Sequence, residues 1–516
     1  MTVTGILKNS LVYTAASAAC RAVHKYGSHS RTLNWLGNAP RYASPDSMEG
    51  SLILGGASRL AHLLFAPLAA VCGCLARQAG GSSILNLKLP LFLTESQVWR
   101  VLAGIRAETA LWLVIFYPVV DYLLRKVSGL SALSGAWDEL LLIFIILAWP
   151  VQMALRGRLS YRSTPLDLPI LVYAGIVLFL FFMRSKNVSL AVEGSRIYLQ
   201  YLFWFFVGSN LIINRRQFQA LIRGLVAVAS LLALVGVLQY LLGVETPAHW
   251  VDQAEASGVK TRVFSIVVSP NVLGSLLVVF TMVTAGQLLA ARGRLERLAY
   301  LGALAVMLAC MVFTYSRGAW LALGLSVTVF SLLYNPRLLL LMAAGSLAAA
   351  KLVPGIGTRL SYLFSASYVA SSQRAGRLAL WQNALEKFLK DPLFGSGFGS
   401  FGGAVAARRI PGSYYIDNFY LKTLVESGLI GLLALVWLLG SALRAGYAAY
   451  KKIAGGELKI LSAAILTGLL GVAAHNLVEN IFEVPMMATY FWLLAGILLA
   501  LPEIQDNPET GSQPPK

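Results

Sequence analysis

Residues 314–320 read Thr314-Tyr315-Ser316-Arg317-Gly318-Ala319-Trp320 and place an arginine between two apolar runs. Leu298 to Phe313 and Leu321 to Leu333 are almost wholly apolar, and the runs on either side of Arg317 are long enough to cross a bilayer. A guanidinium group does not lose its proton, and a charge at membrane depth is costly. Arg317 therefore either reaches a lipid headgroup or faces an anionic partner.

The composition is that of a polytopic membrane protein. The 516 residues are 57% hydrophobic and 13% charged, with a mean hydropathy of +0.69, whereas a soluble domain is about one quarter charged. The net charge of +19 fits basic cytoplasmic loops and contact with anionic headgroups. These charges lie in short loops rather than in one patch, so we expect no nucleic-acid partner. Cys72-Gly-Cys74 lacks a second pair of ligands, so we expect no metal site.

The hydropathy pattern predicts an all-α protein with about twelve transmembrane helices. Residues 1–107 form a basic region that we expect to be cytoplasmic or interfacial, and residues 502–516 a disordered cytoplasmic tail. Between them lie nine spans in residues 108–353, a long outer loop in residues 354–417, and three spans in residues 418–501. The predicted spans are residues 109–124, 138–155, 167–183, 195–213, 218–242, 264–291, 297–315, 317–334, 337–353, 418–441, 458–479 and 484–501.

The distribution of basic residues predicts the orientation. Arginine and lysine are more frequent in the loops that share a side with the N-terminus than in the alternate loops. Since cytoplasmic loops carry the excess of basic residues, both termini should be cytoplasmic. Arg262, Arg317 and the long loop then share the outer face of a cell inner or plasma membrane.

The long loop contains a predicted helix. Ser372 to Lys390 has helical spacing, with Leu378, Trp381, Leu385 and Phe388 on one stripe, which indicates an amphipathic helix near the outer membrane surface. Asp391-Pro392 should end it. The glycine-rich stretch that follows, residues 395–403, matches no nucleotide-binding motif and is better explained as a tight, packed turn.

Polar residues that could carry chemistry gather on the outer side. Arg262 precedes the sixth predicted span, Asn271 lies within it, Arg317 lies between the seventh and eighth, and Asp417-Asn418 closes the long loop. Arginine offers a planar pair of donors to diphosphate oxygens, and a carboxylate can accept a proton from a sugar hydroxyl. This set suits an acidic, lipid-linked substrate.

Each candidate also has a structural explanation. Arg262 could bind a headgroup, Arg317 could form an ion pair, and Asp417 could cap the helix that follows it. Glu426 lies within a span, where it could bind substrate or pair with a basic residue. The cluster His475-Asn476 with Glu479-Asn480 could be a proton relay or a set of hydrogen bonds between helices.

Several motifs resemble the O-antigen ligase and polymerase superfamily. Residues 314–319 resemble its T-x-S-R-G-A segment. Residues 377–381 and 391–397 resemble the R-x3-W and PlfGxG stretches of its long loop, and residues 417–431 resemble its (H/D)-N-x-Y-L and E-x-G-l-i-G segments. The order, spacing and predicted sides agree over residues 255–500, while residues 1–107 have no recognisable counterpart.

This resemblance implies a twelve-helix membrane glycosyltransferase of the GT-C-like type. Such enzymes transfer a glycan from undecaprenyl diphosphate to an acceptor hydroxyl on the outer face and need no metal or other cofactor. By motif, Asp417 and Arg317 are the expected catalytic residues. The expected partners are the lipid-linked glycan, the bilayer and other polysaccharide-export proteins. The expected substrate-binding residues are Arg262, Asn271, Arg377, Asn418 and Glu426.

The resemblance leaves the acceptor open. Ligases of the family carry histidine at the position of Asp417, so the Asp-Asn form favours a polymerase of repeat-unit polysaccharides over a ligase that acts on lipid A core. A rival of another class is a small-anion transporter, since some relatives have been described as bicarbonate transporters. A carrier should show two related halves with interrupted spans, and the sequence shows no convincing internal repeat.

Overall fold

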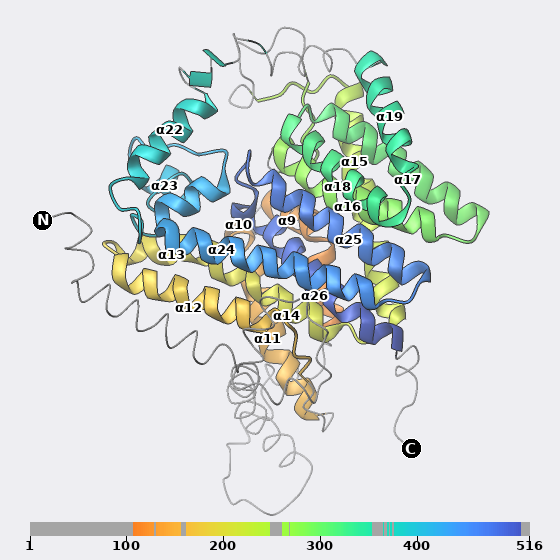
Figure 1. Ribbon diagram of the computed structural model, residues 1–516, viewed down its shortest axis with the longest axis horizontal. Coiled ribbons are helices and arrows are strands. Elements are labelled where there is room, and N and C mark those ends of the chain that lie inside the picture. Colours follow the sequence, from red (N-terminus) through yellow and green to blue (C-terminus); the bar gives the residue numbers. More distant parts are fainter. Residues whose placement is uncertain are drawn as a thin grey trace, which may run out of the picture. The chain divides into compact units, whose positions relative to one another are not determined.

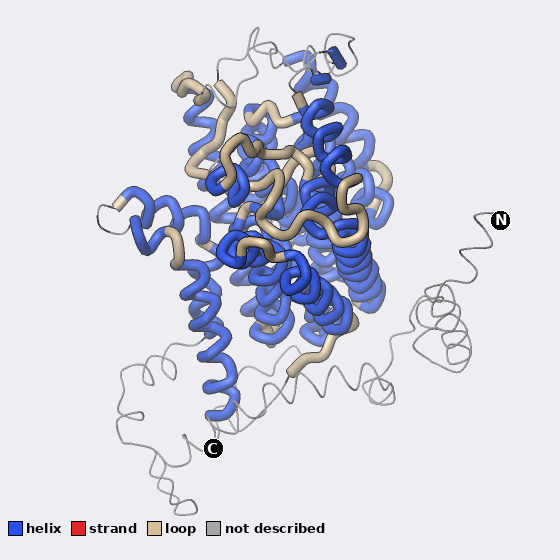
Figure 2. The backbone as a smooth tube through the Cα atoms, turned by 90° about the vertical axis from the view of Figure 1, so that its left-hand side faces the viewer, coloured by secondary structure: helices blue, strands red, loops and turns tan. Residues whose placement is uncertain are grey.

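The computed structural model describes residues 107–127, 129, 131–155, 161–247, 261–267, 269–352, 365, 369, 370, 372, 373 and 376–506. Every regular element within these ranges is a helix (Figures 1 and 2). The prediction of an all-α fold is therefore confirmed. Nearly all of the predicted N-terminal region and residues 507–516 of the predicted tail lie outside the described residues.

The helices range from short turns to long spans. In chain order they are α8 (Ala107–Ile115), α9 (Tyr117–Lys126), α10 (Ser131–Ser134), α11 (Trp137–Leu155), α12 (Asp167–Arg184), α13 (Val188–Leu199), η1 (Gln200–Leu202), α14 (Phe203–Leu211), α15 (Arg215–Leu241), α16 (Pro270–Ala290), α17 (Arg294–Phe313), α18 (Arg317–Tyr334), α19 (Leu338–Leu352), α22 (Arg377–Phe388), α23 (Ala404–Arg409), α24 (Phe419–Lys452), α25 (Gly456–His475), η3 (Ile481–Glu483) and α26 (Pro485–Asp506).

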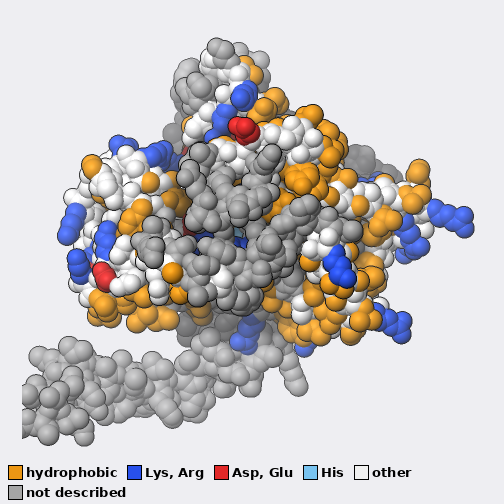
Figure 3. Space-filling model, turned by 90° about the horizontal axis from the view of Figure 1, so that it is seen from above, with side chains coloured by type: hydrophobic (Ala, Val, Ile, Leu, Met, Phe, Trp, Pro, Cys, Tyr) orange, Lys and Arg blue, Asp and Glu red, His pale blue; other side chains and the backbone are white. Residues whose placement is uncertain are grey.

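The long helices are those of a polytopic membrane protein. Among the described residues, eight are long and apolar enough to cross a membrane, namely α12, α15, α16, α17, α18, α24, α25 and α26. Large apolar side chains stand on their outward faces, as at Phe182 of α12 and Leu298 of α17, and hydrophobic side chains cover much of the surface seen in Figure 3. A bilayer removes such side chains from water.

Several predicted spans differ from the observed helices. The predicted span 109–124 is divided between α8 and α9 at Phe116, because Pro118 lacks the amide hydrogen that a continuous helix needs there. The predicted span 195–213 is divided into α13, η1 and α14. At the other end of the chain, α26 continues to Asp506, so the predicted start of the tail at residue 502 is too early. The number of about twelve spans stays a prediction.

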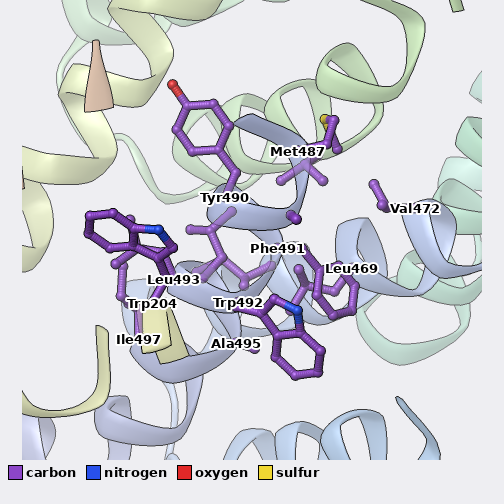
Figure 4. Close-up of a cluster of buried hydrophobic side chains, with 14 of the residues drawn as sticks. Trp204, Leu469, Val472, Met487, Tyr490, Phe491, Trp492, Leu493, Ala495 and Ile497 are labelled. Atoms are coloured by element: carbon purple, nitrogen blue, oxygen red, sulfur yellow. The ribbon is translucent and has the colours of Figure 1, made fainter. Parts of the chain in front are cut away.

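Glycines allow the central helices to approach closely. α16 packs against α15, α17, α18 and α25, and a Cβ added at Gly274 of α16 would lie 2.6 Å from the Cβ of Ala319 in α18. α14 packs on α26 in the same way, since a Cβ at Gly208 would lie 2.3 Å from the carbonyl oxygen of Leu493. Figure 4 shows Trp204 of α14 beside Leu493 and Ile497 of α26. Small residues at helix contacts are typical of packing inside membranes.

The long loop is joined to α24 where that helix breaks. Gly428 has φ 65° and ψ −169°, which interrupts the helix after Ser427. Backbone amides of Ser396 and Gly397 donate to the carbonyls of Val425 and Glu426 at 2.8 and 2.9 Å. In the other direction, Leu429 donates to the carbonyl of Pro392 at 2.9 Å. The loop thus pairs the backbone groups that the break would leave unsatisfied.

This junction explains the glycine-rich stretch. Gly395, Gly397, Gly399 and Gly402 all have positive φ, and each lies against backbone or side-chain atoms of another segment. A Cβ at Gly395 would lie 2.5 Å from the backbone of Glu426 and Gly428. The interpretation of residues 395–403 as a tight, packed turn is confirmed. The predicted helix ahead of it is observed as α22, over Arg377–Phe388 only. Of the predicted apolar stripe, Trp381 and Phe388 pack inward, whereas Leu378 and Leu385 are exposed.

We expect Gly428→Ala to loosen the loop from α24. The backbone conformation of Gly428 (φ 65°, ψ −169°) is essentially restricted to glycine and costs an alanine about 1–3 kcal/mol, and the new Cβ would lie 2.3 Å from the carbonyl oxygen of Leu393. The variant should unfold at a lower temperature in detergent, and trypsin should cut faster after Lys390.

Gly440→Ala is the matched control in the same helix. A Cβ at Gly440 meets no atom within 4 Å, and alanine favours a helix over glycine. Equal unfolding temperatures and equal cleavage rates for the two variants would contradict the role given to the junction.

Candidate functional site

The ends of five helices meet at one end of the helix bundle. This site end is where α16, α18 and α24 begin and where α17 and α25 end. Residues 261–267 lie along the end of α17, since the Val263 amide donates to the Phe313 carbonyl at 3.0 Å. The opposite end carries the Arg215–Glu457 ion pair at 2.7 Å and the predicted cytoplasmic loops.

Arg262 lies beside the turn that carries Arg317. Its Nε donates to the carbonyl oxygen of Thr314 at 3.1 Å, and Arg317 is the first residue of α18, three positions further on. A Cβ at Gly318 would lie 2.7 Å from Nε2 of His475, so the start of α18 lies against the end of α25. Arg317 is partly exposed. The two predicted arginines thus flank one turn.

Strained backbone accompanies both arginines. Among the described residues, Ser265 (φ 55°) and Tyr315 (φ 50°) are the non-glycine residues with positive φ, and both are buried. Ser265 follows Arg262 by three residues, and Tyr315 precedes Arg317 by two. Such conformations persist only where the surroundings impose them, and they concentrate at functional sites.

Gln239 of α15 holds the strained Ser265. Its Oε1 accepts from the amides of Phe264 and Ser265 at 3.2 and 2.7 Å, and its Nε2 donates to the Ser265 carbonyl at 2.8 Å. The Ser265 hydroxyl donates to the Leu232 carbonyl at 2.8 Å. The segment that carries Arg262 is therefore fixed to α15 by a single side-chain amide and by one hydroxyl.

A chain of polar contacts leads from Arg262 to Asp417. Arg262 Nη2 donates to Asn271 Oδ1 at 3.2 Å, and Asn271 Nδ2 donates to Glu479 Oε2 at 2.5 Å. Arg377 Nη2 lies 3.6 Å from the same Glu479 oxygen, while Arg377 Nε donates to Asp417 Oδ2 at 3.0 Å. Two arginines, two carboxylates and one amide thus form one network, in which Arg377 binds Asp417 more closely than Glu479.

Asp417 does not cap α24. The cap is Asn418, whose Oδ1 accepts from the Leu421 amide at 2.9 Å and whose Nδ2 donates to the Leu477 carbonyl at 2.7 Å. Asn418 is buried, whereas the side chain of Asp417 is 32% exposed. Asn418 fixes the start of α24 against the residues after α25, which leaves the Asp417 carboxylate beside Arg377.

Glu426 lies in a different cluster. It forms an ion pair with Lys422 at 2.7 Å, and both side chains are almost fully buried. The Tyr198 hydroxyl donates to Glu426 at 2.8 Å, and the Phe401 amide donates to it at 3.3 Å. Of the two explanations for this residue, the structure favours an internal ion pair that also holds the glycine-rich turn. The structure does not bring Glu426 to the Arg262–Asp417 network.

Glu479 is the residue that the sequence signalled least clearly. It belongs to the cluster around His475, whose other members bind partners outside the network. His475 Nδ1 shares a hydrogen bond with Ser275 Oγ at 2.6 Å, and Asn480 donates to Glu483 at 2.7 Å. Asn476 accepts from two backbone amides. Glu479 alone of the four joins the network. The signal was its carboxyl at the end of an apolar run.

The surroundings of Glu479 raise the pKa of its carboxyl group. It follows the last residue of α25, His475, and is buried in the connection to η3 and α26. Burial, and after it the negative charge of Asp417, raises the pKa of Glu479 to about 8, although Arg377 and Arg262 oppose this shift. The network therefore holds a carboxyl group that is largely uncharged at neutral pH, next to two permanent cations.

Part of the chain is similar to a known family. Residues 302–436, about one quarter of it, match the family model described as O-antigen ligase. This part of the chain is similar to the O-antigen ligase family. The matched part contains Arg317, Arg377 and Asp417, and it runs from α17 into α24. The match favours a membrane enzyme of the ligase and polymerase type.

Two further comparisons add little. No curated protein matches the chain. Among solved structures, a chain from a peptidoglycan synthase complex is similar, with 16% sequence identity and a TM-score of 0.40 over 68% of this chain and 99% of that one. The similarity of residues 302–436 to the O-antigen ligase family is therefore the informative one.

We expect Gln239→Ala to release the Arg262 segment. The change leaves two backbone amides and one carbonyl of residues 264–265 without this partner, and each unpaired buried group costs about 1–3 kcal/mol. The variant should unfold at a lower temperature in detergent and be cut faster by trypsin after Arg262.

Gln239→Glu separates the two kinds of hydrogen bond. A carboxylate still accepts from both amides but cannot donate to the Ser265 carbonyl, so its unfolding temperature should fall between those of the wild type and Gln239→Ala. An alanine variant as stable and as resistant to trypsin as the wild type would contradict the role of Gln239.

Proposed function

We propose that this enzyme transfers a glycan from undecaprenyl diphosphate to a hydroxyl group of an acceptor sugar. The observation that carries the proposal is the meeting of Arg262, Arg317, Arg377 and Asp417 at the site end, three of them within the matched family region. Several fixed cations beside one accessible carboxylate suit a reaction that expels an anion and removes a proton.

The arginines would bind the leaving group. Arg262 and Arg317 flank one turn, and Arg317 begins α18, where the backbone amides of the first helical turn also favour an anion. A guanidinium group pairs two donors with phosphate oxygens and keeps its charge at every working pH. Together they would stabilise the negative charge that grows on the diphosphate as the glycosidic C–O bond breaks.

Asp417 would act as the general base. As the acceptor oxygen forms its bond to the anomeric carbon, the hydroxyl proton passes to the Asp417 carboxylate, and the electron pair of the broken C–O bond leaves with the diphosphate. Arg377, at 3.0 Å from Asp417, would orient this carboxylate. Asn271 would hold the Arg262 side chain, and Asn418 would position Asp417 from the helix cap.

We further propose a polymerase rather than a ligase, with the site end on the outer face of the inner or plasma membrane and both termini in the cytoplasm. The aspartate at residue 417, where ligases of the family carry histidine, supports this choice. The buried position of Glu426 in an ion pair with Lys422 argues for a role in holding the loop, not in contacting the substrate.

The direct test uses the purified protein and an undecaprenyl-diphosphate oligosaccharide. We expect release of undecaprenyl diphosphate together with longer lipid-linked glycans. Transfer to lipid A core without chain growth would instead indicate a ligase. Uptake of bicarbonate into proteoliposomes without any lipid turnover would contradict the enzyme and favour a carrier.

Substitutions of Arg317 test the leaving-group assignment. Arg317→Ala should lower the transfer rate by roughly a hundredfold or more, the usual cost of removing one preorganised donor to a developing anion. Arg317→Lys should recover part of the rate, because lysine keeps the charge but not the paired donors. Arg337→Ala, at an exposed position just after the other end of α18, is the control and should change the rate less than about twofold.

Asp417→Asn tests the base. Loss of a general base lowers a rate by roughly a hundredfold to ten-thousandfold, while binding of undecaprenyl diphosphate should persist, since the arginines remain. The measurements are the transfer rate and the dissociation constant for the lipid diphosphate. Full activity in both Arg317→Ala and Asp417→Asn would refute the site.

A further inference from the structure

Glu479 occupies the point where the two halves of the site meet. On one side, Asn271 donates to it at 2.5 Å and holds Arg262 at 3.2 Å. On the other side, Arg377 lies 3.6 Å from the same carboxyl oxygen and binds Asp417 at 3.0 Å. The side chain is 10% exposed, and its sequence position lies outside the matched family region, which ends at residue 436.

The backbone around Glu479 is as firmly placed as its side chain. Its carbonyl oxygen accepts from the Phe419 amide at 3.3 Å, and the carbonyl of Asn476 accepts from the same amide at 3.0 Å. The residues after α25 are thus tied to the start of α24, two positions after Asp417. A shift at Glu479 would therefore reach Arg262 through Asn271 and would reach Asp417 through both Arg377 and the backbone.

We propose that Glu479 is a positioning residue that couples the donor-binding arginines to the Arg377–Asp417 pair and that favours the lipid diphosphate when it is protonated. This inference rests on the proposed function, because it takes the diphosphate as the ligand of Arg262 and Arg317. It adds a residue and a control by pH that the proposed function does not contain.

Charge balance explains why the protonated form should bind better. With Glu479 uncharged, Asp417 is the negative charge within the network, and it lies against Arg377. With Glu479 ionised, a second negative charge lies on the oxygen that Asn271 and Arg377 contact, and it repels an incoming diphosphate. Among the described residues, the titratable and charged groups that interact with Glu479 are Arg262, Arg377, Tyr415 and Asp417, and His475 interacts with Arg377.

The sign of the pH effect follows from the direction of the shift. Burial raises the pKa of Glu479 to about 8, so the carboxyl is mostly protonated at neutral pH and ionises as the pH rises through that value. Lipid diphosphate should therefore bind well below pH 8 and more weakly above it. The negative charge of Asp417 contributes to this shift.

The experiment measures the dissociation constant of undecaprenyl diphosphate for the purified full-length protein from pH 6.5 to 9.5. For the wild type we expect a roughly tenfold weakening as the pH rises through about 8. Glu479→Gln cannot ionise and should lose this weakening. Ratios between proteins at each pH remove the ionisation of the lipid itself, which is common to all of them.

Glu483→Gln is the matched control. Glu483 is also a buried glutamate with a raised pKa in the same connection, but it accepts from the Ala404 amide and from Asn480, outside the network. This variant should keep the wild-type pH profile. Glu479→Asp retains a titratable carboxyl and should keep an alkaline weakening.

The outcomes separate the inference from the proposed function. A Glu479→Gln variant that binds more weakly by one factor at every pH, with the wild-type profile, would reduce Glu479 to a structural residue and overturn the inference alone. A wild type that binds with no pH dependence near 8 would do the same. A wild type that binds no lipid diphosphate at any pH would overturn the proposed function, and the inference with it.

A second measurement needs no variant and covers the case in which Glu479→Gln does not fold. Calorimetric titration of the wild type at pH 8.5, in two buffers with different heats of ionisation, reports the protons exchanged on binding. We expect proton uptake, because the bound diphosphate favours the protonated carboxyl. No uptake, or net release, would overturn the inference.

Discussion

The pairing of every backbone group away from water is the constraint on which this structure depends. α24 is interrupted at Gly428, and an interruption of a helix at membrane depth leaves amides and carbonyls that lipid cannot satisfy. The residues after Pro392 supply the missing partners, and in doing so they fix the long loop to the bundle. The loop is therefore held by the same hydrogen bonds that make the broken helix possible.

The site follows from that attachment. α22 is carried by the long loop, so the position of Arg377 relative to Asp417 depends on the junction as well as on α24. Arg262 is placed independently, by Gln239 and by the end of α17. The Lys422–Glu426 ion pair also strengthens the junction, because Glu426 accepts from the amide of Phe401 in the glycine-rich turn. Two supports thus position the two halves of one polar network.

Much of this arrangement could be predicted from the sequence, because apolar runs and basic loops report helices and their sides directly. The all-α class, the gathering of Arg262, Arg317 and Asp417 at one end, and the helix within the long loop followed from those patterns. The divided spans were missed because overall hydropathy set their bounds, although Pro118 follows the first break and Gln200 lies at the second.

The rest depended on contacts between distant segments. Lys422 and Glu426 are four residues apart on one helical face, so their ion pair was visible in principle. Nothing local distinguishes Gly428 from a glycine that a helix merely tolerates, since its partners lie near residue 393. Glu479 gained its role from Asn271 and Arg377, which are far away in the chain, and spacing within residues 475–480 could not indicate that.

The junction at Gly428 also limits how the chain can change in length. Residues 392–397 and 425–430 are in register through hydrogen bonds in both directions, so one inserted or deleted residue in either segment would misplace every pair after it. Between them, Pro411 and Gly412 are exposed, and a Cβ at Gly412 meets nothing within 4 Å. Insertions that enlarge the loop should therefore accumulate around residue 411, where added residues would not disturb the hydrogen bonds between the loop and α24.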